Sequence, residues 1–167
     1  MALDMFINFG KGITGGTKDK AQKNSCDVLA FSWGMSQSGS FHAGGGGGAG
    51  KVNVQDLSFT KYVDVATTAI MMHCCTGKHI DKVTLLVRKA GGSLDKPGEK
   101  DIEITMSKVI ITSVSTGGSG GESKFTENVT LNFAEVKFEN MKQDEKGATS
   151  SAGILSWNIA ENTGSDK

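Results

Sequence analysis

The chain has 167 residues, and its 18 lysines and arginines balance 18 aspartates and glutamates, so the formal net charge is zero. A balanced charge argues against a general attraction to nucleic acid or to an anionic membrane. No stretch approaches the roughly 20 apolar residues that a membrane-spanning helix needs. The length fits one domain, residues 1–167, because neither a repeat nor a change of composition divides the chain.

Cysteine usage and the first residues bear on the compartment. Three cysteines, two of them adjacent, do not form a disulfide framework. The first six residues lack the basic and apolar regions of a cleavable signal peptide. We therefore expect synthesis in a reducing cytoplasm, and export only by a route that reads no cleavable signal.

Alternating apolar and polar residues predict a mainly β protein. The predicted strands are residues 5–9, 26–37, 52–62, 80–89, 102–115, 127–138 and 154–159. The alternation changes phase near residue 56 and again inside the 102–115 and 127–138 segments. Such a slip turns the apolar side chains to the other face unless a bulge or corner absorbs it. The slips indicate bent strands that serve two sheets, as in barrels and orthogonal sandwiches.

One α-helix is predicted, over residues 65–76, flanking the two sheets. Asp64 or Thr67 can cap its start, and Gly77 can end it. Its apolar stripe predicts burial against the sheets for Ile70, Met71, Cys74 and Cys75.

The 26–37 segment has two different faces. Its larger side chains are predicted to lie in the core, and they are Asp27, Leu29, Phe31, Trp33 and Met35. The other face carries Val28, Ala30, Ser32, Gly34 and Ser36, and it lacks the lysines and glutamates of an ordinary free surface.

A glycine-rich loop, residues 38–50, follows this segment. Ordering one residue's backbone costs roughly 1–2 kcal/mol, and glycine costs most. Five consecutive glycines cannot recover that cost from their own side chains. The loop is therefore either mobile or held by something outside the chain.

Three glycine motifs suggest chemistry but lack the required context. Residues 10–15 match the dinucleotide fingerprint, yet no apolar-faced helix follows. Residues 45–51 resemble a phosphate-binding loop, but Val52 replaces the Ser or Thr that binds Mg²⁺, and a strand follows. Residues 117–121 match the nucleophile elbow around Ser119, and a strand follows there too. His73, Cys74 and Cys75, with His79, lack the spacing of a structural zinc site.

Longer blocks of the sequence resemble the haemolysin-coregulated protein (Hcp) family, which forms the tube of bacterial type VI secretion systems. The blocks are LAFSWGMSQSGS at 29–40, GGGGGAG at 44–50, VNVQDLSFTKYVD at 52–64, GKH at 77–79, VRKAGG at 87–92, SVSTGGSGG at 113–121 and TENVTLNF at 126–133. The pair Cys74-Cys75, residues 94–100 and residues 140–167 depart from the family pattern.

The resemblance implies a two-sheet, β-barrel-like fold with one flanking helix. It also implies homohexameric rings that stack into a secreted tube and carry effector proteins in the lumen, together with tip spike and contractile sheath proteins as partners. No catalysis, cofactor or metal is implied.

Two sets of residues are the candidates for these contacts. Residues expected to face the lumen are Ala30, Ser32, Gly34 and Ser36. Residues expected in the ring-stacking loop are Phe41, His42, Gly44, Gly45, Gly46, Gly47, Gly48 and Lys51.

Two other classes of function stay open from the sequence. One is a β-barrel that binds a small molecule in its interior. The other is a hydrolase that uses Ser119 with a histidine. The mass of the particle in solution distinguishes these two classes from a ring, because a binding barrel or a hydrolase predicts one or two chains and a ring predicts six.

Overall fold

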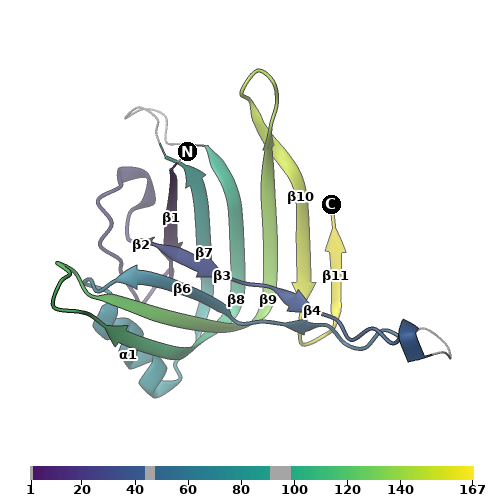
Figure 1. The fold of residues 1–167 in the computed structure, drawn as a ribbon, viewed down its shortest axis with the longest axis horizontal. Coiled ribbons are helices and arrows are strands. Elements are labelled where there is room, and N and C mark those ends of the chain that lie inside the picture. The colour runs from purple at the N-terminus through teal and green to yellow at the C-terminus, as the bar shows by residue number, and fades with distance from the viewer. Residues whose placement is uncertain (1, 44–47, 91–98) are drawn as a thin grey trace.

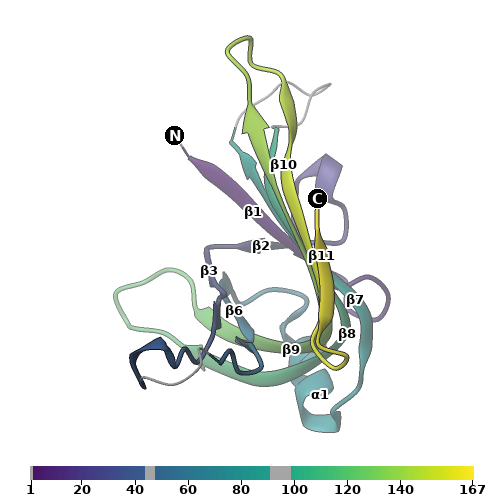
Figure 2. The ribbon, with the colours of Figure 1, turned by 90° about the vertical axis from the view of Figure 1, so that its right-hand side faces the viewer.

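A computed structural model describes residues 2–43, 48–90 and 99–167. Among them are one α-helix, two short 3-10 helices and eleven strands (Figures 1 and 2). The helices are α1 (Thr67–Thr76) and the 3-10 turns Lys20–Gln22 and Phe41–Ala43. The strands are β1 (Leu3–Asn8), β2 (Cys26–Val28), β3 (Ala30–Ser32), β4 (Met35–Ser36), β5 (Asn53–Val54), β6 (Leu57–Tyr62), β7 (Ile80–Lys89), β8 (Lys100–Gly117), β9 (Thr126–Gln143), β10 (Thr149–Asn158) and β11 (Thr163–Asp166).

Two long strands, β8 and β9, connect the two halves of the sheet. The upper half has the order β11-β10-β9-β8-β7-β1-β2. In the lower half, β9 pairs with β6 instead of β10, and β6 pairs with β3. Figure 1 shows β8 and β9 curving from the upright half into the lower half. The core lies between the two halves and α1, as expected for bent strands that serve two sheets.

The phase slips lie at this bend. In β8, burial changes from Ile104 and Met106 to Val109 and Ile111. Between these pairs Lys108 adopts φ +54°, a left-handed conformation that is uncommon for a lysine. The slip in β9 falls at the same level, because Ser107 pairs with Glu135 and Val109 with Phe133. The predicted bend in both strands is therefore confirmed.

The third slip, near Asp56, marks a break between two strands. β5 pairs with β4, whereas β6, which begins one residue after Asp56, pairs with β3 and β9. The single strand predicted at 52–62 is therefore two strands with different partners.

The 26–37 segment also differs from its prediction. It forms three short strands, and burial passes from Cys26 and Val28 to Phe31 and Trp33, so the phase slips here as well. The core prediction is consequently wrong for Asp27, Leu29 and Met35, which are exposed.

Helix α1 begins two residues later than predicted. The residue at the N-cap is Ala66, whose side chain makes no capping bond, so neither predicted cap residue occupies that position. Asp64 and Thr67 instead order the preceding turn, where the Asp64 carboxylate accepts from the Ala66 N–H (2.9 Å) and Thr67 Oγ1 accepts from the Asp64 N–H (3.0 Å). Gly77 ends the helix at φ +65°, as predicted.

The buried face of α1 follows a different stripe from the predicted one. Ala66, Ile70 and His73 are buried, while Met71 and Cys74 are half-buried. The prediction that Cys75 is buried is wrong, because Cys75 is exposed. A stripe chosen from apolar residues alone leaves out His73, which takes the buried position instead. That imidazole is buried with its Nδ1–H donating to the Ala69 carbonyl (2.8 Å).

We predict that Ile70→Ala lowers the free energy of unfolding by about 2–5 kcal/mol, because the side chain is fully buried and its removal leaves a cavity. Urea unfolding at fixed protein concentration measures the change. Met72→Ala is the matched control, since Met72 is 62% exposed on the same helix and should change the value by less than about 0.5 kcal/mol. Equal effects from the two substitutions would contradict this assignment of the helix face.

Candidate functional site

The outer face of the lower half-sheet carries short, uncharged side chains, with the Asp56 carboxylate at its margin, where it accepts from Asn132 Nδ2 (2.8 Å) and Thr112 Oγ1 (3.4 Å). Register aligns Ser32, Ser58, Thr130 and Ser113 in one row across β3, β6, β9 and β8. The next row contains Ala30, Thr60, Asn128 and Ser115. We call these eight residues the uncharged face. The residues between them, such as Phe59 and Val129, point to the core and are buried.

Hydrogen bonds between neighbouring strands order this face. Ser58 and Thr130 share a hydrogen bond of 3.2 Å, and Thr60 Oγ1 donates to Asn128 Oδ1 (2.5 Å). Pairing of these groups with one another leaves a surface of methyls and partly satisfied hydroxyls. Such a surface can contact many partners and carries no fixed charge to select among them.

Only part of the predicted lumen set belongs to this face. Ala30 and Ser32 lie on it, exposed, at the free edge of β3. Gly34 and Ser36 lie beyond it, where the Gly34 carbonyl accepts from Gln55 (2.9 Å) and Ser36 pairs with Asn53. The members of the uncharged face on β6, β8 and β9 were not assigned from the sequence. The signal that could have found them is the alternation of Ser, Thr and Asn with apolar residues in these segments.

A two-stranded arm, residues 34–43 and 48–55, projects from the body (Figures 1 and 2). The β4–β5 pairs and a bridge between Gly39 and Ala49 hold it together. Near its tip, Ser40 Oγ donates to the Gly48 carbonyl and accepts from the Gly48 N–H, both at 3.1 Å. At its root, the Trp33 indole N–H donates to the Gln55 carbonyl (3.0 Å) and its ring stacks on Phe138.

The predicted ring-stacking residues lie on this arm. Phe41, His42, Gly48 and Lys51 are all exposed. Phe41 is 86% exposed, which is unusual for a large apolar side chain. The remaining predicted residues, Gly44 to Gly47, lie outside the described part of the chain.

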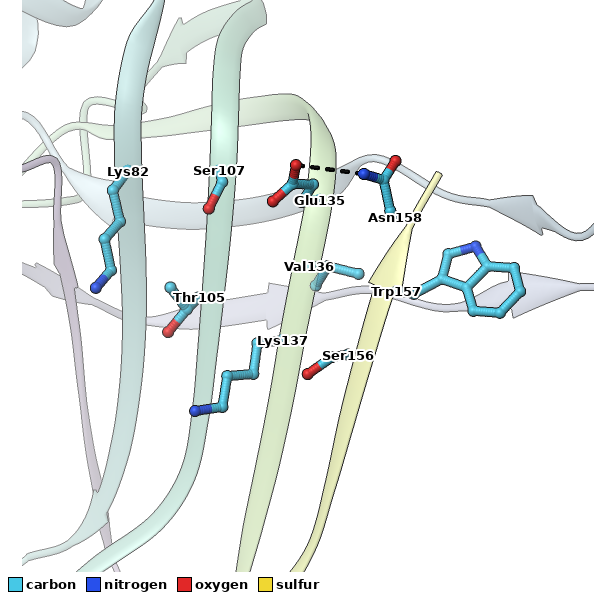
Figure 3. A pocket seen from close by; sticks show the side chains of 9 residues that line it. All are labelled: Lys82, Thr105, Ser107, Glu135, Val136, Lys137, Ser156, Trp157 and Asn158. Carbon is cyan, nitrogen blue, oxygen red and sulfur yellow. Dashed lines mark hydrogen bonds between the residues drawn. The ribbon is translucent and has the colours of Figure 1, made fainter. Parts of the chain in front are cut away.

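A shallow groove of about 360 Å³ lies on the outer side of the upper half-sheet (Figure 3). Asn158 donates to Glu135 across its upper end (3.3 Å), and Lys82 and Lys137 flank the hydroxyls between them. Its lining residues are Lys82, Thr105, Ser107, Glu135, Val136, Lys137, Ser156, Trp157 and Asn158. Small-molecule sites in β-barrels are enclosed in the barrel interior, whereas this groove lies open on the outside of the sheet.

A buried ion pair lies behind the uncharged face. Lys61 on β6 and Glu127 on β9 are directly opposite each other and fully buried, with 2.5 Å between Nζ and Oε1. Lys61 also donates to Asp64 (2.9 Å), and Thr67 Oγ1 donates to Glu127 (3.0 Å). Burial alone would lower the pKa of Lys61, but its hydrogen bonds to Glu127 and Asp64 raise it above the ordinary value.

The sequence motifs form no arrangement for catalysis in the described residues. After Gly15 the chain continues to a 3-10 turn rather than to the helix that a dinucleotide site requires. Ser119 lies exposed in the β8–β9 connection, and no histidine is hydrogen-bonded to it. His73, Cys74 and Cys75 lie on different sides of α1, and no group of three metal-ligating side chains occurs in the described ranges. No described helix has the length and apolarity to cross a bilayer.

The bent two-part sheet, the uncharged face and the exposed arm define the class: a β-rich assembly protein that works through contact surfaces. The family model "Type VI secretion system effector, Hcp" matches residues 6–139. Protein hcp1 of Pseudomonas aeruginosa is 54% identical over 97% of this chain and 98% of its own length.

Solved structures agree with this relationship. Hcp1 from Salmonella typhimurium is 32% identical with a TM-score of 0.78, over 99% of this chain and 100% of that chain. A type six secretion system protein that is 24% identical supports the fold, with a TM-score of 0.87 over 98% of this chain and 100% of that one. The chain belongs to the Hcp family and is a tube subunit of a type VI secretion system. The small-molecule-binding barrel is therefore not favoured.

The buried ion pair gives a stability prediction. Lys61→Met should lower the free energy of unfolding by about 3–5 kcal/mol, because it leaves the Glu127 carboxylate buried without its cation. The double variant Lys61→Met with Glu127→Leu should recover most of that loss, since no unpaired charge remains. Urea unfolding of the two variants is the measurement, and a double variant no more stable than Lys61→Met would contradict it.

Proposed function

We propose that six copies of this chain form a ring and that rings stack into a hollow tube whose lumen carries effector proteins. The uncharged face is the observation that carries the proposal. Eight adjoining positions on a sheet without lysine, arginine, aspartate or glutamate are unusual for a free protein surface. The uncharged face fits the inner wall of a channel through which cargo of different charges must pass.

The arm is the proposed contact between successive rings, through Phe41, His42, Lys51 and the glycine segment 44–48. A projecting arm with an exposed aromatic side chain gains little within its own chain. Contact with a neighbouring copy would bury that side chain. Six arms in a ring act together, so a weak contact on each adds up to a stable stack.

The system's tip spike and contractile sheath are the other proposed partners. In this proposal the subunit is made in the bacterial cytoplasm and leaves through the type VI machinery. It acts as a structural and carrier protein, with neither catalysis nor a cofactor.

The ring is directly testable. Negative-stain microscopy of the purified protein should show rings with a central hole, and light scattering should give a mass of six chains. Each chain is 17.5 kDa. A species of one or two chains at high concentration would exclude the proposal.

We predict that Ser32→Gln leaves the ring intact but lowers recovery of a co-expressed effector, to about a tenth or less, because every subunit repeats the substitution. Co-purification of effector per ring is the measurement. Ser150→Gln is the matched control, since Ser150 is an exposed serine on β10, away from the uncharged face. Unchanged recovery with Ser32→Gln would place this residue outside the cargo contact, and loss of the ring would place it in a subunit contact.

A further inference from the structure

An apolar surface lies where β6 ends and β9 begins. It contains Tyr62, Val63, Val65 and Phe125, which are 40%, 40%, 74% and 62% exposed. These residues are contiguous, because the Val63 N–H donates to the Phe125 carbonyl (3.0 Å) and Tyr62 pairs with Thr126. We call these four residues the end surface.

Glycines hold two side chains of the end surface in position. A Cβ on Gly118 would lie 2.1 Å from the Phe125 ring, and one on Gly16 would lie 2.9 Å from Val65. Each of the two side chains therefore packs closely on backbone on one side while its other side stays open to solvent. Contacts of this kind restrict the rotamers before a partner arrives, which lowers the entropy cost of binding.

A polar recess of about 480 Å³ adjoins the end surface. Gly16 and Lys124 line it, and they also contact Val65 and the Tyr62 ring respectively. Its other charged lining residues are Asp4, Lys18, Asp19 and Asp27. Arg88 pairs with Asp19 and lies 3.9 Å from Asp4, so Asp27 is the lining aspartate that forms no ion pair among the described residues.

One carboxylate of this recess is open to a cation from outside. Buried Arg88 pairs with Asp19 beneath the recess, so that carboxylate is already neutralised. Asp27 is exposed, and its Oδ1 accepts from Thr17 (2.7 Å), which leaves its other oxygen free of a described partner.

The arm is complementary to the end surface and its recess, because it carries exposed apolar side chains and only basic ionisable groups. Phe41 and Met35 on it are 86% and 45% exposed. The only ionisable side chains between Trp33 and Gln55 are His42 and Lys51, so the arm carries no acidic group. The arm and the β8–β9 connection lie at opposite ends of the molecule's longest axis (Figure 1). An arm therefore cannot reach the end surface of its own chain.

We propose that the arm of one copy docks on the end surface of a neighbouring copy, with Phe41 against the apolar residues and Lys51 towards the recess. Two different patches at opposite ends make a heterologous contact, which propagates along a stack of rings. The proposal rests on self-assembly of this chain and adds the receptor that the arm uses.

Cross-linking between single cysteines tests the contact. In a Cys74→Ser, Cys75→Ser background, Gln37→Cys places a thiol on the arm and Lys124→Cys places one beside Phe125. With a short bismaleimide reagent, a mixture of the two variants should give cross-linked dimers, and neither variant alone should do so. One chain with both substitutions should give a ladder that lengthens with the number of stacked rings. A ladder that always stops at six would place the contact within a ring and reject its role in stacking.

Matched variants test the apolar part of the contact. Phe125→Asp, added to the same cysteine pair, should lower the dimer yield about tenfold, the effect of losing one central apolar contact. Met72→Asp should leave the yield unchanged, since Met72 is equally exposed at 62% but lies on α1, outside the end surface.

Two results would overturn the proposal: Lys124→Cys cross-linking to itself as well as to the arm, or equal effects of Phe125→Asp and Met72→Asp. Negative-stain microscopy of the Cys74→Ser, Cys75→Ser protein distinguishes a failure of this contact from a failure of the proposed self-assembly. Rings without arm cross-links would reject only this contact, whereas the absence of rings would reject the proposed self-assembly.

Discussion

The fold depends on one constraint, which is that β8 and β9 must bend together while they stay paired. Each strand has 18 residues, and each belongs to both halves of the sheet. In β8, even-numbered residues such as Ile104 and Met106 face the core before the bend, and odd-numbered residues such as Val109 and Ile111 face it beyond the bend. Because Ser107 pairs with Glu135 and Val109 with Phe133, the change of phase must occur at one level in both strands. Lys108, in its left-handed conformation, lies at that level.

The bend determines where the candidate surfaces lie. In the lower half, the face turned away from the core presents Ser, Thr and Asn from β6, β8 and β9. In the upper half, the outward face presents the charged groove around Lys82 and Lys137. One pair of strands therefore gives the molecule two outer faces of different chemistry, one uncharged and one charged.

The Lys61–Glu127 pair favours the observed register of the lower half. The two side chains meet only when β6 and β9 pair as observed, and a slip of one residue would bury each charge without its partner. The same cluster includes Asp64 and Thr67 at the start of α1. Correct strand pairing and correct helix placement are thus coupled through one buried polar cluster.

Sequence patterns predicted what depends on neighbouring residues along the chain. The bend in β8 and β9, the helix and its Gly77 end all follow from local alternation and capping chemistry. The 26–37 segment was less predictable, because its strands are three residues or fewer and period-two alternation cannot be read over so short a length.

The candidate surfaces were harder to predict than the fold. Ala30 and Ser32 were found on one strand, but their neighbours Ser58, Thr130 and Ser113 come from segments far apart in sequence. Only the strand register brings these residues together. The end surface was missed for the same reason, since Val63 and Phe125 are joined by pairing between β6 and β9.

The chemistry of the cysteines bears on how the protein behaves in different surroundings. Burial, together with nearby Asp64, raises the pKa of the Cys26 thiol to about 12, so almost none of it is the reactive thiolate at neutral pH. All three cysteines are free, and no covalent cross-link supports the fold. The fold consequently needs no disulfide to form. A chain of this kind can fold where glutathione is reduced and keep the same structure after transfer to an oxidising medium.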